Sequence, residues 1–180
     1  MKDGSIVETS LNYNIVYEEM IFEEQGNRMA LSNLEAIDTV YLQHRKFVPA
    51  GAVFFEVLVN APISLFIQQQ SKVEYAAGST NGYGSNTQSA QQSSIVLSQV
   101  LSRTHYNMEL TDKDYTLRPN SQYWIRKNTI LYKANNEKQV LKIFPEISGE
   151  LKLYIKQNKL EIYKTEDLEK LVSYINTLAH

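Results

Sequence analysis

The chain has 180 residues, a formal net charge of −2 and no cysteine. This length suffices for one domain with a buried core, and the lack of cysteine excludes disulfides and thiolate metal sites. The weakly acidic balance excludes a general nucleic-acid binder, and no apolar run reaches the roughly 20 residues of a membrane-spanning helix.

Charge is distributed unevenly along the chain. Residues 1–110 carry 6 basic and 11 acidic side chains, whereas residues 126–180 carry 10 basic and 7 acidic ones, so that these parts have net charges of −5 and +3. We therefore expect the two ends to differ electrostatically, which affects association more than it affects the fold.

The first third of the chain has the pattern of short strands. Apolar and polar residues alternate from Asn12 to Phe22, and Glu24-Gln25-Gly26-Asn27 suits a turn, so Asn12–Leu31 is predicted to form a β-hairpin. A turn at residues 32–35 and a further strand at Ala36–Gln43 follow.

The most apolar stretch runs from Phe47 to Ile67, and we interpret it as a buried hairpin. An extended Val53–Val59 is largely apolar on both sides, which predicts an interior strand. Its expected faces are Val53, Phe55, Val57 and Val59 on one side, and Phe54, Glu56 and Leu58 on the other. After the turn at Pro62, the alternation through Ile67 indicates a half-buried strand, and such closely spaced strands favour an antiparallel meander.

The middle of the chain is polar and without charge. No charged residue occurs between Tyr75 and Ser102, and Gly78–Ser94 consists almost entirely of Gly, Ser, Thr, Asn and Gln. We predict a long surface loop at about 75–94; the functional alternative is a binding loop centred on Tyr83. Ile95–Leu101 fits a strand or a helical turn equally well.

Regular secondary structure is expected to resume between the polar loop and the C-terminal helices. Short extended pieces at Tyr106–Leu110 and Tyr115–Leu117 precede a last hairpin formed by Gln122–Lys127 and Thr129–Ala134, joined near Asn128.

Three helical segments follow that hairpin. Asn135 or Asn136 can cap a helix over Glu137–Phe144, which Pro145 must end. The apolar stripe that begins at Ile147 predicts a second helix ending near Asn158. A third is expected to begin with Thr165 as its N-cap, with an apolar stripe at Leu168, Leu171, Val172, Ile175 and Leu178.

These elements predict an α+β fold. We expect an N-terminal antiparallel, curved β-sheet or partial barrel over residues 1–134, and two or three C-terminal α-helices over residues 135–180, packed together as one structural unit.

Few residues have the spacing of a catalytic or metal site. His44, His105 and His180 are far apart, and Asp112-Lys113-Asp114 lacks the glycine and glutamate of a calcium loop, so no metal site and no cofactor are predicted. The chain has no nucleophile elbow, and the adjacent carboxylates at 18–19 and 23–24 would point to opposite faces of a strand.

Glu56 is the one unusual carboxylate, because it interrupts the apolar strand Val53–Val59. Desolvation there would raise its pKa, as a general acid requires, and a buried glutamate held by a structural partner is the favoured alternative. No catalytic residue is assigned on this basis.

Candidate binding residues are Tyr83 in the polar loop, and Trp124 and Arg126 in the last hairpin. The chain has 12 tyrosines and one tryptophan, a composition that suits a protein or glycan partner, although tyrosine is also simply a good strand former. The cluster at Trp124 is weak support for single-stranded nucleic acid, which we do not predict as a partner.

The sequence resembles uncharacterised proteins of Bacteroidota in the segments YWIRK, LYK and LKIFP, in the Lys-rich helices after them, and upstream in FFEVLVN and NGYGSNTQS. Members of that group typically carry a secretion leader, so the resemblance implies an exported or envelope location and implies no activity. MKDGSIVETSLNY has no apolar signal segment, so we expect export only if a leader was removed, and otherwise a cytoplasmic protein.

The leading hypothesis is a non-enzymatic exported or envelope-associated protein that binds a partner or ligand through its sheet face or polar loop. The alternatives are a hydrolase-type enzyme with a raised-pKa carboxylate in a cleft, and a small-molecule carrier with a barrel cavity.

Overall fold

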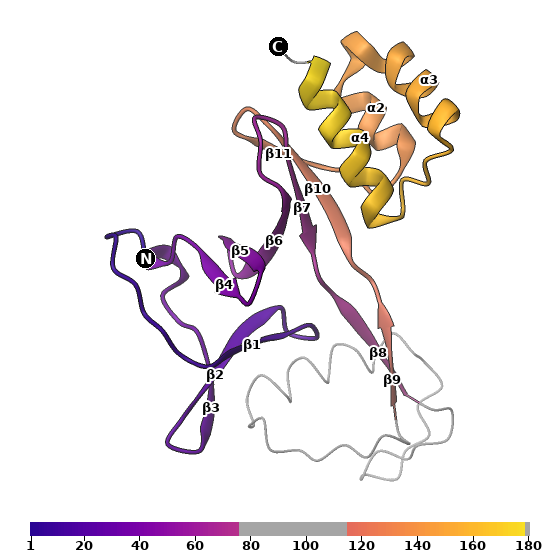
Figure 1. The fold of residues 1–180 in the computed structure, drawn as a ribbon. Helices are drawn as coiled ribbons and strands as arrows, with labels where there is room; N and C mark the ends of the chain where they lie inside the picture. The colour runs from indigo at the N-terminus through magenta and orange to yellow at the C-terminus, as the bar shows by residue number, and fades with distance from the viewer. Residues whose placement is uncertain (76–114, 179–180) are drawn as a thin grey trace.

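The computed structural model describes residues 1–75 and 115–178 and has an α+β fold, in which antiparallel sheets precede a layer of helices (Figure 1). The predicted fold class is therefore confirmed. Each sheet of the described chain has two free ends in its strand order, so none closes into a barrel.

A three-stranded sheet forms the N-terminal part, in the order β1-β2-β3. Its strands are β1 (Leu11–Asn14), β2 (Glu19–Glu24) and β3 (Asn27–Ala30). The predicted turn at Gly26 is present, with φ of 78° at that glycine. The predicted first strand is interrupted, because the Asn14 side chain accepts hydrogen bonds from the N–H groups of Val16 and Tyr17 and so closes a tight turn before β2.

The six-stranded sheet is the centre of the molecule and has the order β11-β10-β7-β6-β5-β4, with antiparallel neighbours throughout. Its strands are β4 (Val40–Leu42), β5 (Arg45–Ala50), β6 (Val53–Val59), β7 (Ser64–Gln68), β10 (Gln122–Lys127) and β11 (Ile130–Lys133). The strand predicted at Ala36–Gln43 is shorter than expected, because the 3-10 turn Leu34–Ala36 includes its first residue and β4 begins only at Val40.

β6 is an interior strand, as predicted, with buried Phe54 and Phe55 on opposite faces. The prediction for Val59 was wrong. The pairing of β6 with β7 contains a β-bulge between Val57 and Val59, which turns Val59 to the same side as Leu58.

The predicted Phe47–Ile67 hairpin contains three strands instead of two. Gly51, with φ of 69°, provides an additional tight turn between β5 and β6. β7 is buried on both faces rather than one, since Ser64 and Leu65 are both 0% exposed. The prediction of a half-buried strand fails because β7 lies between two longer strands near the middle of the sheet.

A two-stranded arm extends β7 and β10 away from the helices (Figure 1). It consists of β8 (Ser71–Tyr75), which was not predicted, and β9 (Tyr115–Pro119), which includes the predicted extended piece at 115–117. The predicted polar loop, Tyr83, and the segments Ile95–Leu101 and Tyr106–Leu110 lie outside the described residues, as do Asp112-Lys113-Asp114.

The C-terminal helices agree closely with the prediction. They are α2 (Glu137–Ile143), the 3-10 turn Pro145–Ile147, α3 (Ser148–Asn158) and α4 (Thr165–Leu178). The Asn136 side chain caps α2 by accepting a hydrogen bond from the N–H of Gln139. Thr165 was predicted as an N-cap; it is instead the first helical residue, and its hydroxyl lies 2.6 Å from that of Tyr123 in β10.

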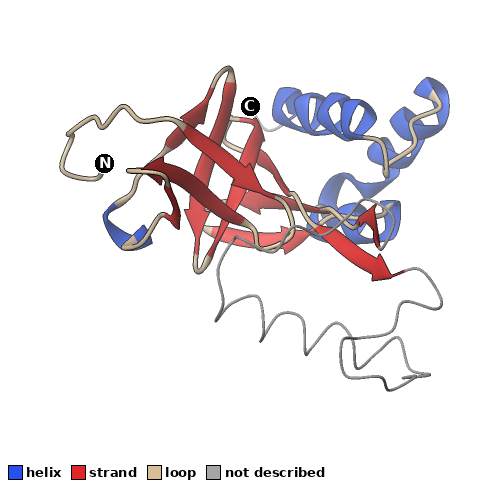
Figure 2. Cartoon of the chain, turned by 90° about the horizontal axis from the view of Figure 1, so that it is seen from below, coloured by secondary structure: helices blue, strands red, loops and turns tan. Residues whose placement is uncertain are grey.

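Two hydrophobic clusters lie on the same face of the six-stranded sheet, which we call the core face. The helices pack over one part of it, against Ile63, Leu65 and Ile125. The three-stranded sheet packs over another part, where Met20 contacts the cluster of Phe47 and Phe54. Figure 2 shows the C-terminal helices grouped together at one side of the strands, with the short 3-10 turn Leu34–Ala36 at the opposite side.

Candidate functional site

Trp124 and Arg126 lie two positions apart on β10, so their side chains share one face of the sheet. In the pairing with β7, Trp124 lies opposite Phe66 and Arg126 lies opposite Ser64. This face is opposite the core face, because Ile125, which alternates with these two residues, belongs to the cluster under the helices.

Three rings from neighbouring strands form a packed layer on this face. Phe55 and Trp124 stack with their centroids 5.5 Å apart at an interplanar angle of 22°, and Phe55 lies 6.5 Å from Phe66. Phe55 is only 6% exposed and Phe66 only 3%. Each such ring pair contributes about 0.5–1.5 kcal/mol beyond its buried area, so the layer is a stable platform without any described helix over it.

Two cations lie over this layer. The Arg126 guanidinium is 5.1 Å from the centroid of Phe66, and its Nη2 donates to the Ser64 hydroxyl over 3.0 Å. The Lys133 ammonium is 5.2 Å from the centroid of Trp124. Neither cation forms an ion pair within the described residues.

We call this side of the sheet the aromatic face; it is defined by Phe55, Phe66, Trp124, Arg126 and Lys133, with Tyr41, Lys46 and Leu131 toward its edges. The only acidic residue in the six strands is Glu56, which lies on the core face.

The aromatic face has a polar boundary where β7 ends. Trp124 Nε1 donates to the Gln68 side-chain oxygen over 3.1 Å, and the Gln68 amide in turn donates to Glu18 over 2.6 Å. Glu18 belongs to the turn before β2, so the N-terminal part of the chain supplies a carboxylate at this boundary. The indole is thereby held in a fixed orientation.

The structure brings together two of the three predicted binding residues. Trp124 and Arg126 are close neighbours, and Tyr83 lies outside the described residues. Lys133 was missed because the predicted hairpin, joined at Asn128 alone, would pair Trp124 with Tyr132. The actual turn has two residues, Asn128 and Thr129, and it shifts the register by one residue so that Lys133 lies opposite Trp124. Phe55 and Phe66 could not be assigned to the site because their register with β10 depends on tertiary pairing.

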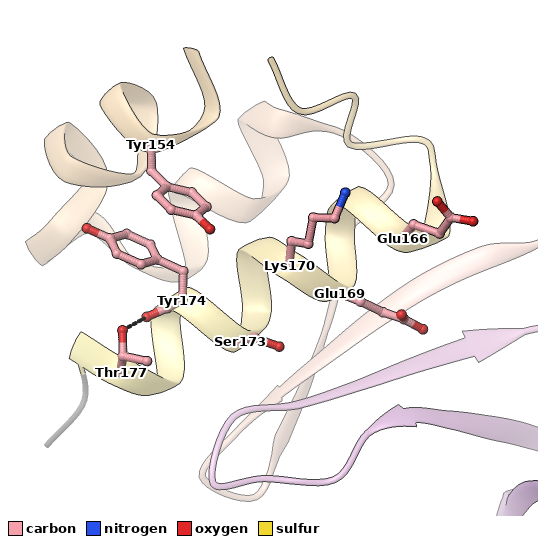
Figure 3. A pocket seen from close by; sticks show the side chains of 7 residues that line it. All are labelled: Tyr154, Glu166, Glu169, Lys170, Ser173, Tyr174 and Thr177. Atoms are coloured by element: carbon pink, nitrogen blue, oxygen red, sulfur yellow. Dashed lines mark hydrogen bonds between the residues drawn. The ribbon is translucent and has the colours of Figure 1, made fainter. Parts of the chain in front are cut away.

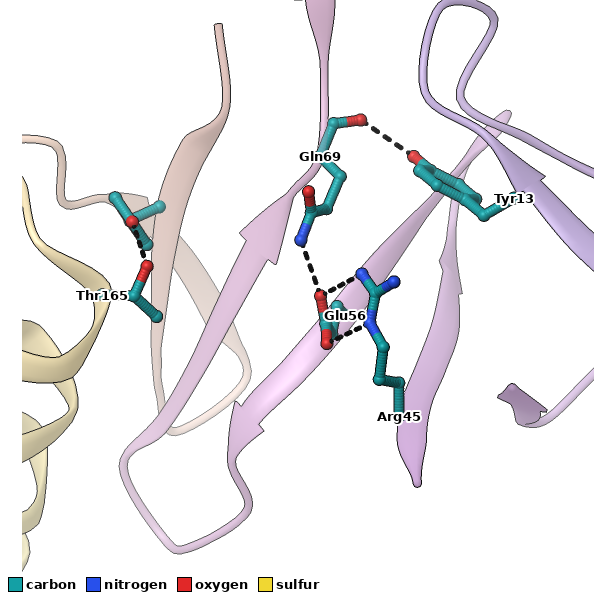
Figure 4. A network of polar contacts seen from close by, with 6 residues as sticks. Tyr13, Arg45, Glu56, Gln69 and Thr165 are labelled. Carbon is teal, nitrogen blue, oxygen red and sulfur yellow. Dashed lines mark hydrogen bonds and ion pairs between the residues drawn. The ribbon is translucent and has the colours of Figure 1, made fainter. Parts of the chain in front are cut away.

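Glu56 lies on the core face at the centre of a polar network (Figure 4). Arg45 Nε and Nη2 each donate to a different Glu56 carboxylate oxygen over 2.7 Å, and Gln69 Nε2 donates to it over 2.8 Å. The Tyr13 hydroxyl donates to the Gln69 carbonyl oxygen. The guanidinium also lies 4.9 Å from the centroid of Phe47.

This network decides the role of Glu56. Burial alone raises the pKa of the carboxyl, but the hydrogen bonds from Arg45 and Gln69 outweigh burial, and the net pKa of Glu56 is lowered. The hypothesis of a raised-pKa general acid at Glu56 was therefore wrong. The favoured alternative, a buried glutamate held by a structural partner, is what the structure contains.

The helical layer has an open groove of about 620 Å³ between α3 and α4 (Figure 3). Tyr154 and Tyr174 line it as a parallel pair with ring centroids 3.8 Å apart. Burial, and then the charges of Glu166 and Glu56, raise the pKa of Glu169 at the other end of the groove. Figure 3 shows the Glu169 carboxylate directed away from the tyrosines, so these groups do not converge on one reacting atom.

Metal ligands are not gathered in the part of the chain that the structure describes, where no group of three or more His, Asp or Glu side chains could hold an ion. His44 is exposed, and His105 and His180 lie outside the described residues. Among the described helices, none has the length and apolar character needed to cross a bilayer.

Comparison with known proteins gave no relatives: no family model, no curated protein and no solved structure matches this chain. The resemblance to Bacteroidota proteins therefore stays a prediction, and functional inference depends on the geometry of the site.

Proposed function

We propose that this protein is a non-catalytic binding module that recognises an acidic polypeptide through the aromatic face. The proposal depends on one observation: Arg126 and Lys133 lie over aromatic rings with no carboxylate paired to them in the described chain. Unpaired cations on an apolar platform attract an anionic partner, and the partly buried position of Arg126 strengthens that attraction.

A polypeptide fits this face better than a glycan. Stacking of a sugar needs an accessible ring face, but Phe55 and Phe66 are almost fully buried. The indole ring of Trp124 contacts Phe55 of β6 and Lys133 of β11, and these two strands lie on opposite sides of β10. The indole is therefore in contact with other side chains from both directions. The accessible groups are therefore cations and aliphatic stems, which suit acidic side chains separated by apolar ones.

An exported or envelope location, as the resemblance to Bacteroidota proteins implies, belongs to the same proposal. The partner would then be another exported or envelope protein with an acidic, extended segment. Fractionation of the native host, with immunoblotting of periplasmic and cytoplasmic fractions, tests the location independently of binding.

Binding is tested with a defined probe: a fluorescein-labelled peptide of about ten residues that alternates glutamate and valine, so that all carboxylates lie on one side when it is extended. We expect saturable binding by fluorescence anisotropy, together with a change in the emission of Trp124, the one tryptophan. The double variant Arg126→Ala/Lys133→Ala should bind about tenfold more weakly or worse.

A charge-matched variant, Lys152→Ala/Lys156→Ala on the exposed side of α3, is the control and should bind as the wild type does. Raising the salt concentration should weaken wild-type binding more than binding by the double variant. Equal affinity for a lysine–valine peptide, or equal affinity of both double variants, would contradict the proposal.

A further inference from the structure

We infer that the acidic polypeptide binds as an added β-strand along β11, extending the six-stranded sheet. This inference rests on the proposed function, and it specifies the element that the partner contacts. β11 is at one end of the strand order, so one side of its backbone has no neighbouring strand in the described chain.

The backbone geometry of β11 identifies the free groups. The N–H of Ala134 donates to the Tyr123 carbonyl of β10, and strand alternation then directs Tyr132 and Ile130 to β10 as well. The N–H and C=O groups of Leu131 and Lys133 therefore point outward. They have no hydrogen-bond partner among the described residues.

All four side chains of β11 are exposed. Ile130 is 55% exposed, Leu131 41% and Tyr132 36%, which gives three consecutive accessible apolar residues. Edge strands that are not used for binding are normally protected by charges, bulges or covering elements, and Lys133 is the one charged residue in β11. An added strand would cover these side chains on both faces of the sheet.

Charge complementarity indicates which kind of strand pairs with β11. On the aromatic face, a strand beside β11 would run past Leu131 and Lys133, with Arg126 on the next strand. A second copy of β11 in that position would place two Lys133 side chains on the same face of the sheet, in a part of the chain with a net charge of +3. An acidic strand instead meets unpaired cations, so strand addition by an acidic partner is favoured over self-association.

The direct test is the variant Leu131→Pro, because proline removes only the N–H that points outward and leaves the bonds of β11 to β10 in place. Leu131→Ala is its control, since it removes the side chain and keeps the N–H. With the glutamate–valine probe, we expect Leu131→Pro to weaken binding at least about fivefold relative to Leu131→Ala. Amide hydrogen exchange should show that Leu131 and Lys133 become protected only when the peptide is bound.

A second measurement needs no protein variant and applies even if Leu131→Pro does not fold. Two versions of the peptide, N-methylated at the odd or at the even positions, should differ in affinity for the wild-type protein. Every second N–H of an added strand points to β11, so N-methylation removes the hydrogen bonds to β11 in only one of the two versions. If the probe binds with dependence on Arg126 and Lys133 but both N-methylated versions and both Leu131 variants behave alike, strand addition is wrong and the proposed function stands. If the probe does not bind at all, the proposed function itself fails.

Discussion

Glu56 shows how a single buried carboxylate can mislead a search for catalysis. The residue interrupts an apolar strand, so its position resembles that of a general acid with a raised pKa. The deciding factor is Arg45, which forms a two-point ion pair with it from the adjacent strand. The charged form is thereby favoured, and the carboxylate holds β5, β6 and Gln69 together.

Replacing Glu56 by glutamine should lower the free energy of unfolding by about 1–3 kcal/mol at neutral pH, because Arg45 loses its partner while the side chain at 56 stays buried. The control is Glu24→Gln, an exposed site in β2, which should change stability by less than about 0.5 kcal/mol. Urea denaturation of the three proteins provides the comparison.

The same variant gives a pH dependence with a definite sign. Since the folded-state pKa of Glu56 lies below its ordinary value of 4.5, the contribution of the ion pair is fully present above that pH and is lost as the pH falls through the folded-state pKa. The stability difference between wild type and Glu56→Gln should therefore shrink as the pH falls from about 5 to about 2. A difference that stays constant over this range would contradict the role of the charge.

At the residue scale, strand alternation was enough to place Trp124 and Arg126 on one face, because they are two positions apart. The partner of Glu56 could not be identified in the same way. Arg45 reaches Glu56 only because the turn at Gly51 sets the register of β5 against β6, and that turn was not recognised within the apolar stretch.

At the scale of elements, one side chain joins α4 to the sheet. The Asn176 amide oxygen accepts from the N–H of Ile63 over 2.9 Å, and its nitrogen donates to the Ile63 carbonyl over 2.9 Å. The nitrogen also lies 2.9 Å from the carbonyl oxygen of Val172, one turn earlier in the helix. Asn176 thus completes the backbone hydrogen bonding of the turn between β6 and β7.

The variant Asn176→Ala should lower stability by about 1–2 kcal/mol, because the N–H and C=O of the buried Ile63 lose their partner. Ser173→Ala, at an exposed site on the same helix, controls for the change in helix propensity and should be neutral or slightly stabilising. Equal effects of the two substitutions would show that the contact to Ile63 contributes nothing.

Elements with local signals were predicted well, and elements that depend on partners were not. Asn136 and Pro145 define α2 from within its own sequence, so its bounds were predicted to within a residue. β8, with the sequence SKVEY, has a weak apolar pattern and exists through its pairing with β9, which lies some forty residues later in the chain.

At the scale of the whole molecule, the helices and the sheet share a single hydrophobic cluster. Leu65 and Ile125 of the sheet belong to the same buried set as Leu151 and Leu168 of the helices. Neither layer can bury its apolar face alone. We therefore expect that the parts before and after residue 134 are not stable as separate units.

Thermal or urea unfolding should therefore be a single transition. Trp124 is the one tryptophan and lies in the sheet, whereas ellipticity at about 222 nm reports mainly on the helices, so the two signals follow different layers of the same protein. We expect their midpoints to coincide. Separate midpoints would show that the helical layer unfolds by itself.

The bulge in β6 has a consequence for the dimensions of the aromatic face. Because it turns Val59 toward the helices, the strand contributes no side chain to the aromatic face beyond Val57. If the proposed acidic segment binds there, its contacts are limited on that side and lie toward β10 and β11 instead. One extra backbone residue thus both extends the surface on which the helices pack and sets the border of the aromatic face.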